Sequence, residues 1–251
     1  MSKKGYDFYK EEPREFLNCV MQEDKKREQI MGNRFACELA VVDKALGLQF
    51  QGFQTFRESE KEFSFPVQQL LTRLFNHQLA VRKLLLMGYI TEAASILARS
   101  METIWLVRYF DCYPNEVDRW WGEDRGRIIR PDELRKKLKH ASKEGKLRIG
   151  DVDNENKLYA ALCEIGHPNY VGSVQHVHLK NVSPPQIEFS LGGYGSLERA
   201  GWLEKAFKWL LHIQMCSLIT MAAVSKEFLG NNKAWMQDYS SVLEDLGNAL
   251  K

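Results

Sequence analysis

Apolar residues recur every three or four positions through most of this chain, and that spacing predicts a protein built mainly of α-helices. The stretch from about Glu11 to Gly47 has this pattern, with Pro13 near its first turn and Gly32 as the candidate break between two helices. The aromatic stretch that follows, from Phe50 to Phe65, is expected to be a connector whose rings cap the core.

The middle of the chain predicts two antiparallel helices joined by a tight turn. Pro66 is a suitable first residue for one helix, which runs to Met87 and ends at Gly88. The next helix, from Thr91 to Phe110, is apolar on nearly every side. A helix without a polar face belongs at the centre of a bundle.

Shorter elements are expected after this helical pair. Pro114 and Pro131 each stand where a short helix would begin, and Asp153 is the expected cap of a helix that runs through Ile165. Residues 174–179 and 186–191 then alternate between apolar and polar side chains around two adjacent prolines. Such alternation predicts a small β-hairpin.

The C-terminal part is expected to form a long helix from Ser196 to about Leu229 and an amphipathic one from Asn231 to Leu250. No internal repeat is apparent, and no linker is polar enough to separate domains. We therefore predict one all-α domain over residues 1–251. It would comprise an N-terminal helical region (1–65) and a helical bundle (66–251) with a β-hairpin insertion near 174–191.

Composition points to an ordinary globular protein in a reducing compartment. The net charge of +2 is too small to indicate a nucleic-acid or membrane partner by itself. The five cysteines are scattered and contain no Cys-x-x-Cys pair, which favours reduced thiols over disulfides or a zinc ribbon. The polar N-terminus does not look like a secretory signal, and the longest apolar run, Trp209 to Val224, is shorter than the ~20 residues of a membrane span. We expect a cytoplasmic protein with no membrane contact.

Three residues are candidates for a polar site. Arg99 and Glu102 share one face of the apolar helix, so both charges are expected to be withdrawn from water. His167 stands between Gly166 and Pro168, where it is either a helix cap or a general base. The simpler alternative is that Arg99 and Glu102 form a structural salt bridge that fixes helix packing.

Positive charge is concentrated between Arg125 and Arg148, where Lys and Arg exceed Asp and Glu by seven. Such a segment can attract a phosphate backbone without reading bases, although a solvated helix face has the same composition. The candidate nucleic-acid contacts are Arg125, Arg127, Arg130, Arg135, Lys136 and Lys139.

Metal and cofactor chemistry has weaker support. His176 and His178 would lie on one face of a strand, with His167 and Cys163 upstream as conceivable further ligands, but the spacing does not match known zinc sites. Glycine-rich phosphate loops, a Gly-x-Ser-x-Gly elbow and a His-Glu-x-x-His motif are all absent from the sequence. We predict no metal and no cofactor, and keep a metal-dependent hydrolase as the least favoured alternative.

Several short motifs stand out along the chain: His77 to Gly88, Glu92-Ala93, Leu97 to Glu102 with its Arg-Ser-x-x-Glu core, Leu158-Tyr159 and His167-Pro168. They resemble those of a family of bacterial helical proteins of unknown function, similar in layout to the HEPN superfamily (higher eukaryotes and prokaryotes nucleotide-binding). Together they extend over about half of the chain.

The resemblance implies a HEPN-like bundle that pairs as a homodimer and binds RNA or a nucleotide, in stress response or phage defence. Active HEPN ribonucleases carry an Arg four to six residues before the catalytic His, and no Arg precedes His167 at that distance. The resemblance thus implies a degenerate or atypical ribonuclease site of Arg99, Glu102 and His167. In a cutting enzyme His167 would be the base, and Arg99 would stabilise charge on the phosphate. The alternative from another class is a non-catalytic scaffold or regulatory homodimer.

Overall fold

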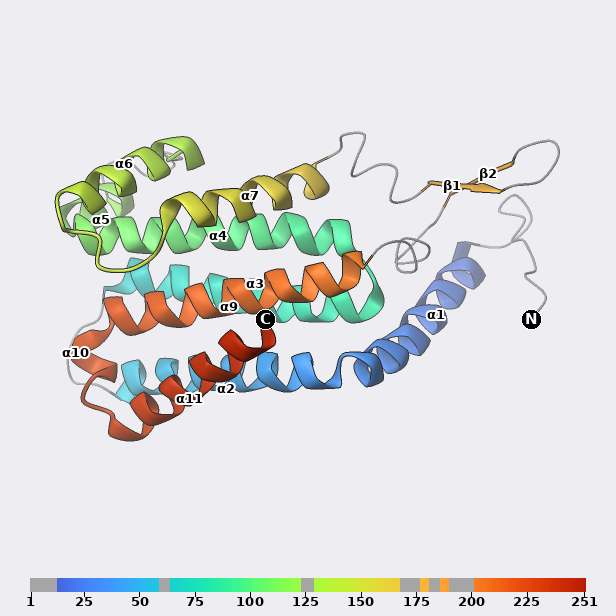
Figure 1. Ribbon diagram of the computed structural model, residues 1–251, viewed down its shortest axis with the longest axis horizontal. Coiled ribbons are helices and arrows are strands. Elements are labelled where there is room, and N and C mark those ends of the chain that lie inside the picture. The colour runs from blue at the N-terminus through green and yellow to red at the C-terminus, as the bar shows by residue number, and fades with distance from the viewer. Residues whose placement is uncertain (1–12, 59–63, 123–128, 168–176, 181–185, 190–200) are drawn as a thin grey trace.

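The chain is an all-α helical bundle, seen in a computed structural model that describes residues 13–58, 64–122, 129–167, 177–180, 186–189 and 201–251 (Figure 1). Within these ranges the helices are α1 (Pro13–Arg34), α2 (Ala36–Glu58), α3 (Phe65–Met87), α4 (Ile90–Cys112), α5 (Asn115–Trp121), α6 (Pro131–Lys143), α7 (Val152–Gly166), α9 (Trp202–Val224), α10 (Lys226–Leu229) and α11 (Lys233–Ala249). Two short strands, β1 (Val177–Lys180) and β2 (Gln186–Phe189), pair antiparallel, with Val177 opposite Phe189. They occupy the place where the sequence predicts a hairpin.

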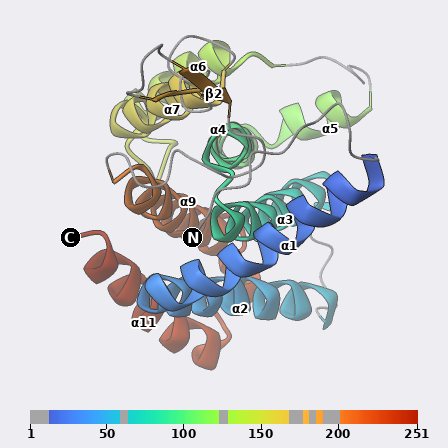
Figure 2. The same ribbon diagram turned by 90° about the vertical axis from the view of Figure 1, so that its right-hand side faces the viewer.

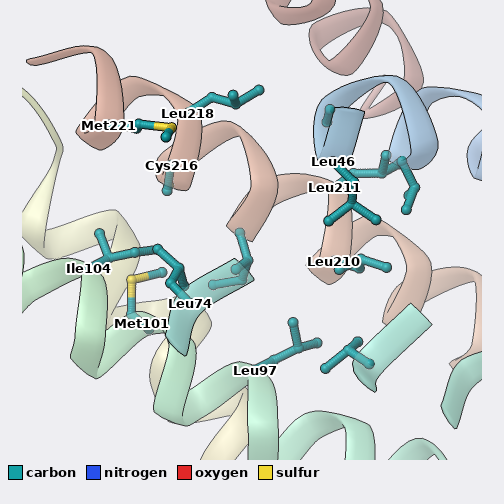
Figure 3. Packing of buried hydrophobic residues seen from close by; sticks show 14 of the residues in the cluster. Leu46, Leu74, Leu97, Met101, Ile104, Leu210, Leu211, Cys216, Leu218 and Met221 are labelled. Carbon is teal, nitrogen blue, oxygen red and sulfur yellow. The ribbon is translucent and has the colours of Figure 1, made fainter. Parts of the chain in front are cut away.

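Helix α4 lies at the centre of the bundle, as its lack of a polar face predicts. Viewed end-on, it has α3, α7 and α9 around it (Figure 2), and these three make its most extensive contacts. Leu97, Met101 and Ile104 of α4 are fully buried and point toward α3 and α9 (Figure 3). One continuous cluster of buried apolar side chains draws on helices from α1 to α11.

The first two helices divide at Phe35 rather than at the predicted Gly32, which lies inside α1. Backbone hydrogen bonds continue through the junction, from the Phe35 amide to the Met31 carbonyl and from the Leu39 amide to the Phe35 carbonyl, each 2.9 Å. The break is therefore a kink, and the buried Phe35 ring stacks on Phe207 of α9 at 4.4 Å. Packing, rather than glycine, sets the boundary.

The aromatic connector predicted from Phe50 to Phe65 is wrong over most of its length, because α2 continues to Glu58. Phe53 and Phe56 are three residues apart and lie on neighbouring parts of one helix face. Phe53 packs edge-on against Phe75 of α3 at 5.7 Å, and Phe56 packs against Phe228 of α10 at 5.9 Å. Their rings bind α2 to the core, so tertiary contacts override a local pattern that looked like a loop.

Two helix ends are set by the residue at the end itself, a glycine after α3 and an aspartate before α7. Gly88 ends α3 with φ of 83°, as predicted. The helix through Ile165 is capped by Asp151 instead of the predicted Asp153, since the Asp151 carboxylate accepts hydrogen bonds from the amides of Asp153 and Asn154, both 3.1 Å. That cap sets the start of α7, the helix that carries several residues of the candidate site.

The long helix predicted from Ser196 to Leu229 is divided at Ser225 into α9 and α10, and its predicted start lies outside the described residues. Helix α9 has 23 residues and is the one described helix long and apolar enough to cross a membrane. In its most apolar window 56% of the residues are buried, and α9 packs against α2, α3, α4 and α11. This burial is that of a core helix in a bundle.

Candidate functional site

Helices α4 and α7 run antiparallel and meet along a polar line that we call the α4–α7 seam. From one end to the other, Ser95 Oγ donates to the Gly166 carbonyl at 2.8 Å, and Tyr159 Oη donates to Glu102 Oε1 at 2.8 Å. Farther along, Trp105 Nε1 donates to Glu155 Oε2 at 2.9 Å. The seam thus places Glu102, a residue of the predicted site, one turn from the contact between Trp105 and Glu155. Neither Trp105 nor Glu155 was among the site residues predicted from the sequence.

Arg99 and Glu102 form the predicted ion pair, with Arg99 Nη1 2.8 Å from Glu102 Oε2. The expectation that both charges leave water is wrong for Arg99, whose side chain is 62% exposed, whereas that of Glu102 is 19% exposed. The hydrogen bond from Arg99 to Glu102 raises the pKa of Arg99. Glu102 therefore holds a charged guanidinium in place at the surface.

Tyr159 fixes this arrangement from the opposite helix. Its hydroxyl donates to Glu102, and burial raises the pKa of Tyr159 well above its ordinary value, so it stays a donor at neutral pH. Arg135 of α6 lies over the rings of both Trp105 and Tyr159, with its guanidinium carbon 5.5 and 5.3 Å from the ring centroids. Three helices thus meet at one aromatic and cationic cluster.

His167 caps α7 at the end of the seam, and its side chain is exposed. The approach of the two helices is close there, because a Cβ atom on Gly166 would lie 2.9 Å from the backbone of Ser95. Among the described residues, His167 makes no hydrogen bond or ion pair with Arg99 or Glu102. The structure therefore places the three predicted residues along one seam but does not join them into a buried triad.

Among the described residues, the buried ion pair is a different one, Arg108 with Glu155. Arg108 Nη1 lies 2.6 Å from Glu155 Oε1, and the two side chains are 2% and 4% exposed. Trp105 donates to the second oxygen of Glu155, and Arg108 Nε donates to Thr220 Oγ1 at 2.8 Å. These bonds tie α4, α7 and α9 together, which is the arrangement that a buried pair needs to offset its desolvation.

Titratable groups beside this pair are held in their uncharged forms. Burial raises the pKa of Cys216 to about 12, so its thiol stays protonated and is a poor nucleophile. Burial also lowers the pKa of His212, which favours the neutral imidazole. The cluster around Arg108 and Glu155 is consequently suited to holding helices together.

Arg108 and Glu155 were not singled out from the sequence, although one signal was available. Arg108 is a lone cation inside the apolar run from Ile104 to Phe110, and a charge in such a run needs a buried partner. Glu155 carries no comparable signal, because it follows Asp153 and Asn154 in a polar helix start. Its role becomes visible only once α7 packs on α4.

The predicted nucleic-acid contacts have different surroundings. Arg125 and Arg127 lie outside the described residues, and Arg135 is partly buried against aromatic rings. Lys139 pairs with Asp153 of α7. Arg130 is exposed, and Lys136 is 82% exposed with its ammonium 3.9 Å from Asp132. Lys136 and Arg130 are thus the members of the set most open to a ligand.

Metal binding has no support in the part of the chain that the structure describes. No group of three or more His, Cys, Asp or Glu side chains lies close enough there to hold an ion. His176 is outside the described residues, and His178 is in β1. Comparison of the chain with models of known families, with curated proteins and with solved structures found no match.

Proposed function

We propose that the protein binds the phosphate backbone of nucleic acid through the outer face of α6. The observation that carries this proposal is a stripe of exposed lysines, Lys136, Lys139 and Lys143, spaced so that they share one side of the helix. The opposite side carries Leu134 and Leu138, which are 2% and 0% exposed and hold α6 on the bundle.

The charge balance around this lysine stripe favours an anionic partner. Residues 129–148 contain eight Lys or Arg and three Asp or Glu. Lys139 is engaged with Asp153, but Lys136 is only distantly paired, and Lys143 makes no ion pair with another described residue. Phosphate contacts made by such side chains release counterions and do not depend on base sequence.

Salt-dependent binding tests the proposal. We expect the protein to shift mixed-sequence RNA and DNA at low salt, with affinity falling steeply as salt rises. The double variant Lys136→Glu/Lys143→Glu should weaken binding about tenfold or more and reduce the salt slope by about 2, because two phosphate contacts are lost. Electrophoretic mobility shift at several salt concentrations measures both quantities.

The matched control is Lys25→Glu/Lys233→Glu, which makes the same change in net charge on α1 and α11, where both lysines are exposed. This control should retain most of the affinity. Equal loss of affinity in the two double variants would show that binding depends on the net charge of the protein and not on the lysine stripe of α6. Failure of the wild-type protein to bind at low salt would favour the non-catalytic scaffold instead.

A second candidate function, RNA cleavage at the α4–α7 seam, rests on the exposure of both Arg99 and His167. We expect binding without cleavage, because no described residue orients the His167 imidazole as a general base requires. Labelled RNA should stay intact under conditions in which it is fully bound. Cleavage that is lost in His167→Ala, while this variant still binds the RNA, would contradict this expectation.

A further inference from the structure

A cavity of about 310 Å³ opens where the start of α3, the end of α4, α5 and the end of α9 meet. Its apolar lining includes Val67, Val107, Phe110 and Val117, all between 0% and 7% exposed. These four side chains belong to the buried apolar cluster, so the inner wall of the cavity is part of the core of the bundle. Its volume is near the lower end of the range, ~300–1,000 Å³, that small-molecule sites usually have.

Among the described residues that line this cavity, the charged ones are two carboxylates, Asp111 and Asp118. Neither makes an ion pair with another described residue. Both side chains are exposed to solvent at the mouth of the cavity. Desolvation by the neighbouring protein atoms nevertheless raises the pKa of Asp111, and the nearby charge of Arg148 partly opposes that shift. A carboxylate that is partly desolvated beside an apolar surface is stabilised when a cation approaches it.

Aromatic side chains stand next to the lining residues. Phe65 follows the lining residue Ser64, and Trp121 lies three residues after Asp118. The two rings meet edge to face at 5.7 Å, and their side chains are 55% and 41% exposed. Exposed aromatic faces attract organic cations as well as apolar groups.

We propose that this cavity is a binding site for a small organic cation, an amine with an apolar body about the size of one aromatic ring. The apolar walls would take the body, and Asp111 and Asp118 would face the ammonium group. Charge complementarity favours this cation over an anion of the same shape, since the described residues that line the cavity include two carboxylates and neither lysine nor arginine. The site lies on other residues than the lysine stripe of α6, so it is independent of nucleic-acid binding.

Three probes of one shape test the proposal on the full chain: phenethylamine, phenethyl alcohol and phenylacetate. Calorimetric or tryptophan-fluorescence titration should show saturable binding of the amine, at least about tenfold weaker binding of the alcohol, and no binding of the acid. Equal affinity for all three, or no saturable binding of the amine, would overturn the proposal.

Two conservative variants identify the site. Asp111→Asn and Asp118→Asn should each weaken amine binding, the pair together by about tenfold or more, while leaving binding of the neutral alcohol unchanged. Asp238→Asn removes an exposed carboxylate of α11 and is the matched control. Unchanged amine affinity in the double variant, measured on protein with a wild-type circular dichroism spectrum, would place the amine elsewhere.

Discussion

Replacing Glu155 by alanine should lower the free energy of unfolding by about 3–5 kcal/mol, because the change leaves the Arg108 guanidinium buried without its counter-charge. Arg108 is 2% exposed, and its remaining hydrogen bond to Thr220 cannot neutralise it. Trp105 would also lose the acceptor for its indole N–H. Urea denaturation followed by circular dichroism measures the loss.

Two comparisons separate this effect from ordinary side-chain truncation. Glu102→Ala should cost only about 1–2 kcal/mol, because Arg99 is largely exposed and the loss is a screened ion pair plus one hydrogen bond from Tyr159. The double change Arg108→Met/Glu155→Leu should recover most of the stability, since no charge is left behind. A larger loss in Glu102→Ala than in Glu155→Ala would reverse our assignment of the buried pair.

The helical architecture was predictable because its signals are local. Pro66 and Gly88 delimit α3 to within a residue or two, and the apolar surface of α4 places it at the centre of the bundle. The kink at Phe35 and the extension of α2 past Phe50 were not predictable in the same way. Both depend on rings that pack against residues far away in the chain, Phe207 and Phe75.

The site was only partly predictable, for a geometric reason. Arg99 and Arg108 are nine residues apart, which at 3.6 residues per turn places them on opposite sides of α4. An amphipathic helix would show which side is buried, but α4 is apolar nearly all round and gives no such signal. The sequence therefore identified an ion pair on the correct helix and assigned burial to the wrong arginine.

In helix α6, by contrast, the spacing of apolar and charged residues correctly predicted which side faces solvent. Leu134 and Leu138 mark the buried side, so the lysines on the other side are exposed as expected. Arg135 lies between these two sides and reaches the rings of Trp105 and Tyr159. Its partners come from two other helices, which no pattern within α6 could reveal.

The change Gly150→Ala is the second one expected to lower the stability strongly, because Gly150 lies against the buried pair of Arg108 and Glu155. Its φ is +96°, and a Cβ atom there would lie 2.1 Å from Arg108 Nη1 and 3.1 Å from Glu155 Oε1. The change Gly150→Ala adds backbone strain of about 1–2 kcal/mol to a steric clash of about 1–3 kcal/mol. We expect a total loss of about 2–5 kcal/mol in the free energy of unfolding, again measured by urea denaturation.

Gly145 is a close control for this change. It has φ of +70° in the turn that follows α6, and no atom lies within 4 Å of the place where its Cβ would be. Gly145→Ala should therefore cost the backbone strain alone, about 1–2 kcal/mol. In the Arg108→Met/Glu155→Leu background, the extra cost of Gly150→Ala should shrink toward that of Gly145→Ala, because the clash is with the ion pair itself. An unchanged extra cost in that background would mean that Gly150 and the pair are not coupled, and that another contact governs the start of α7.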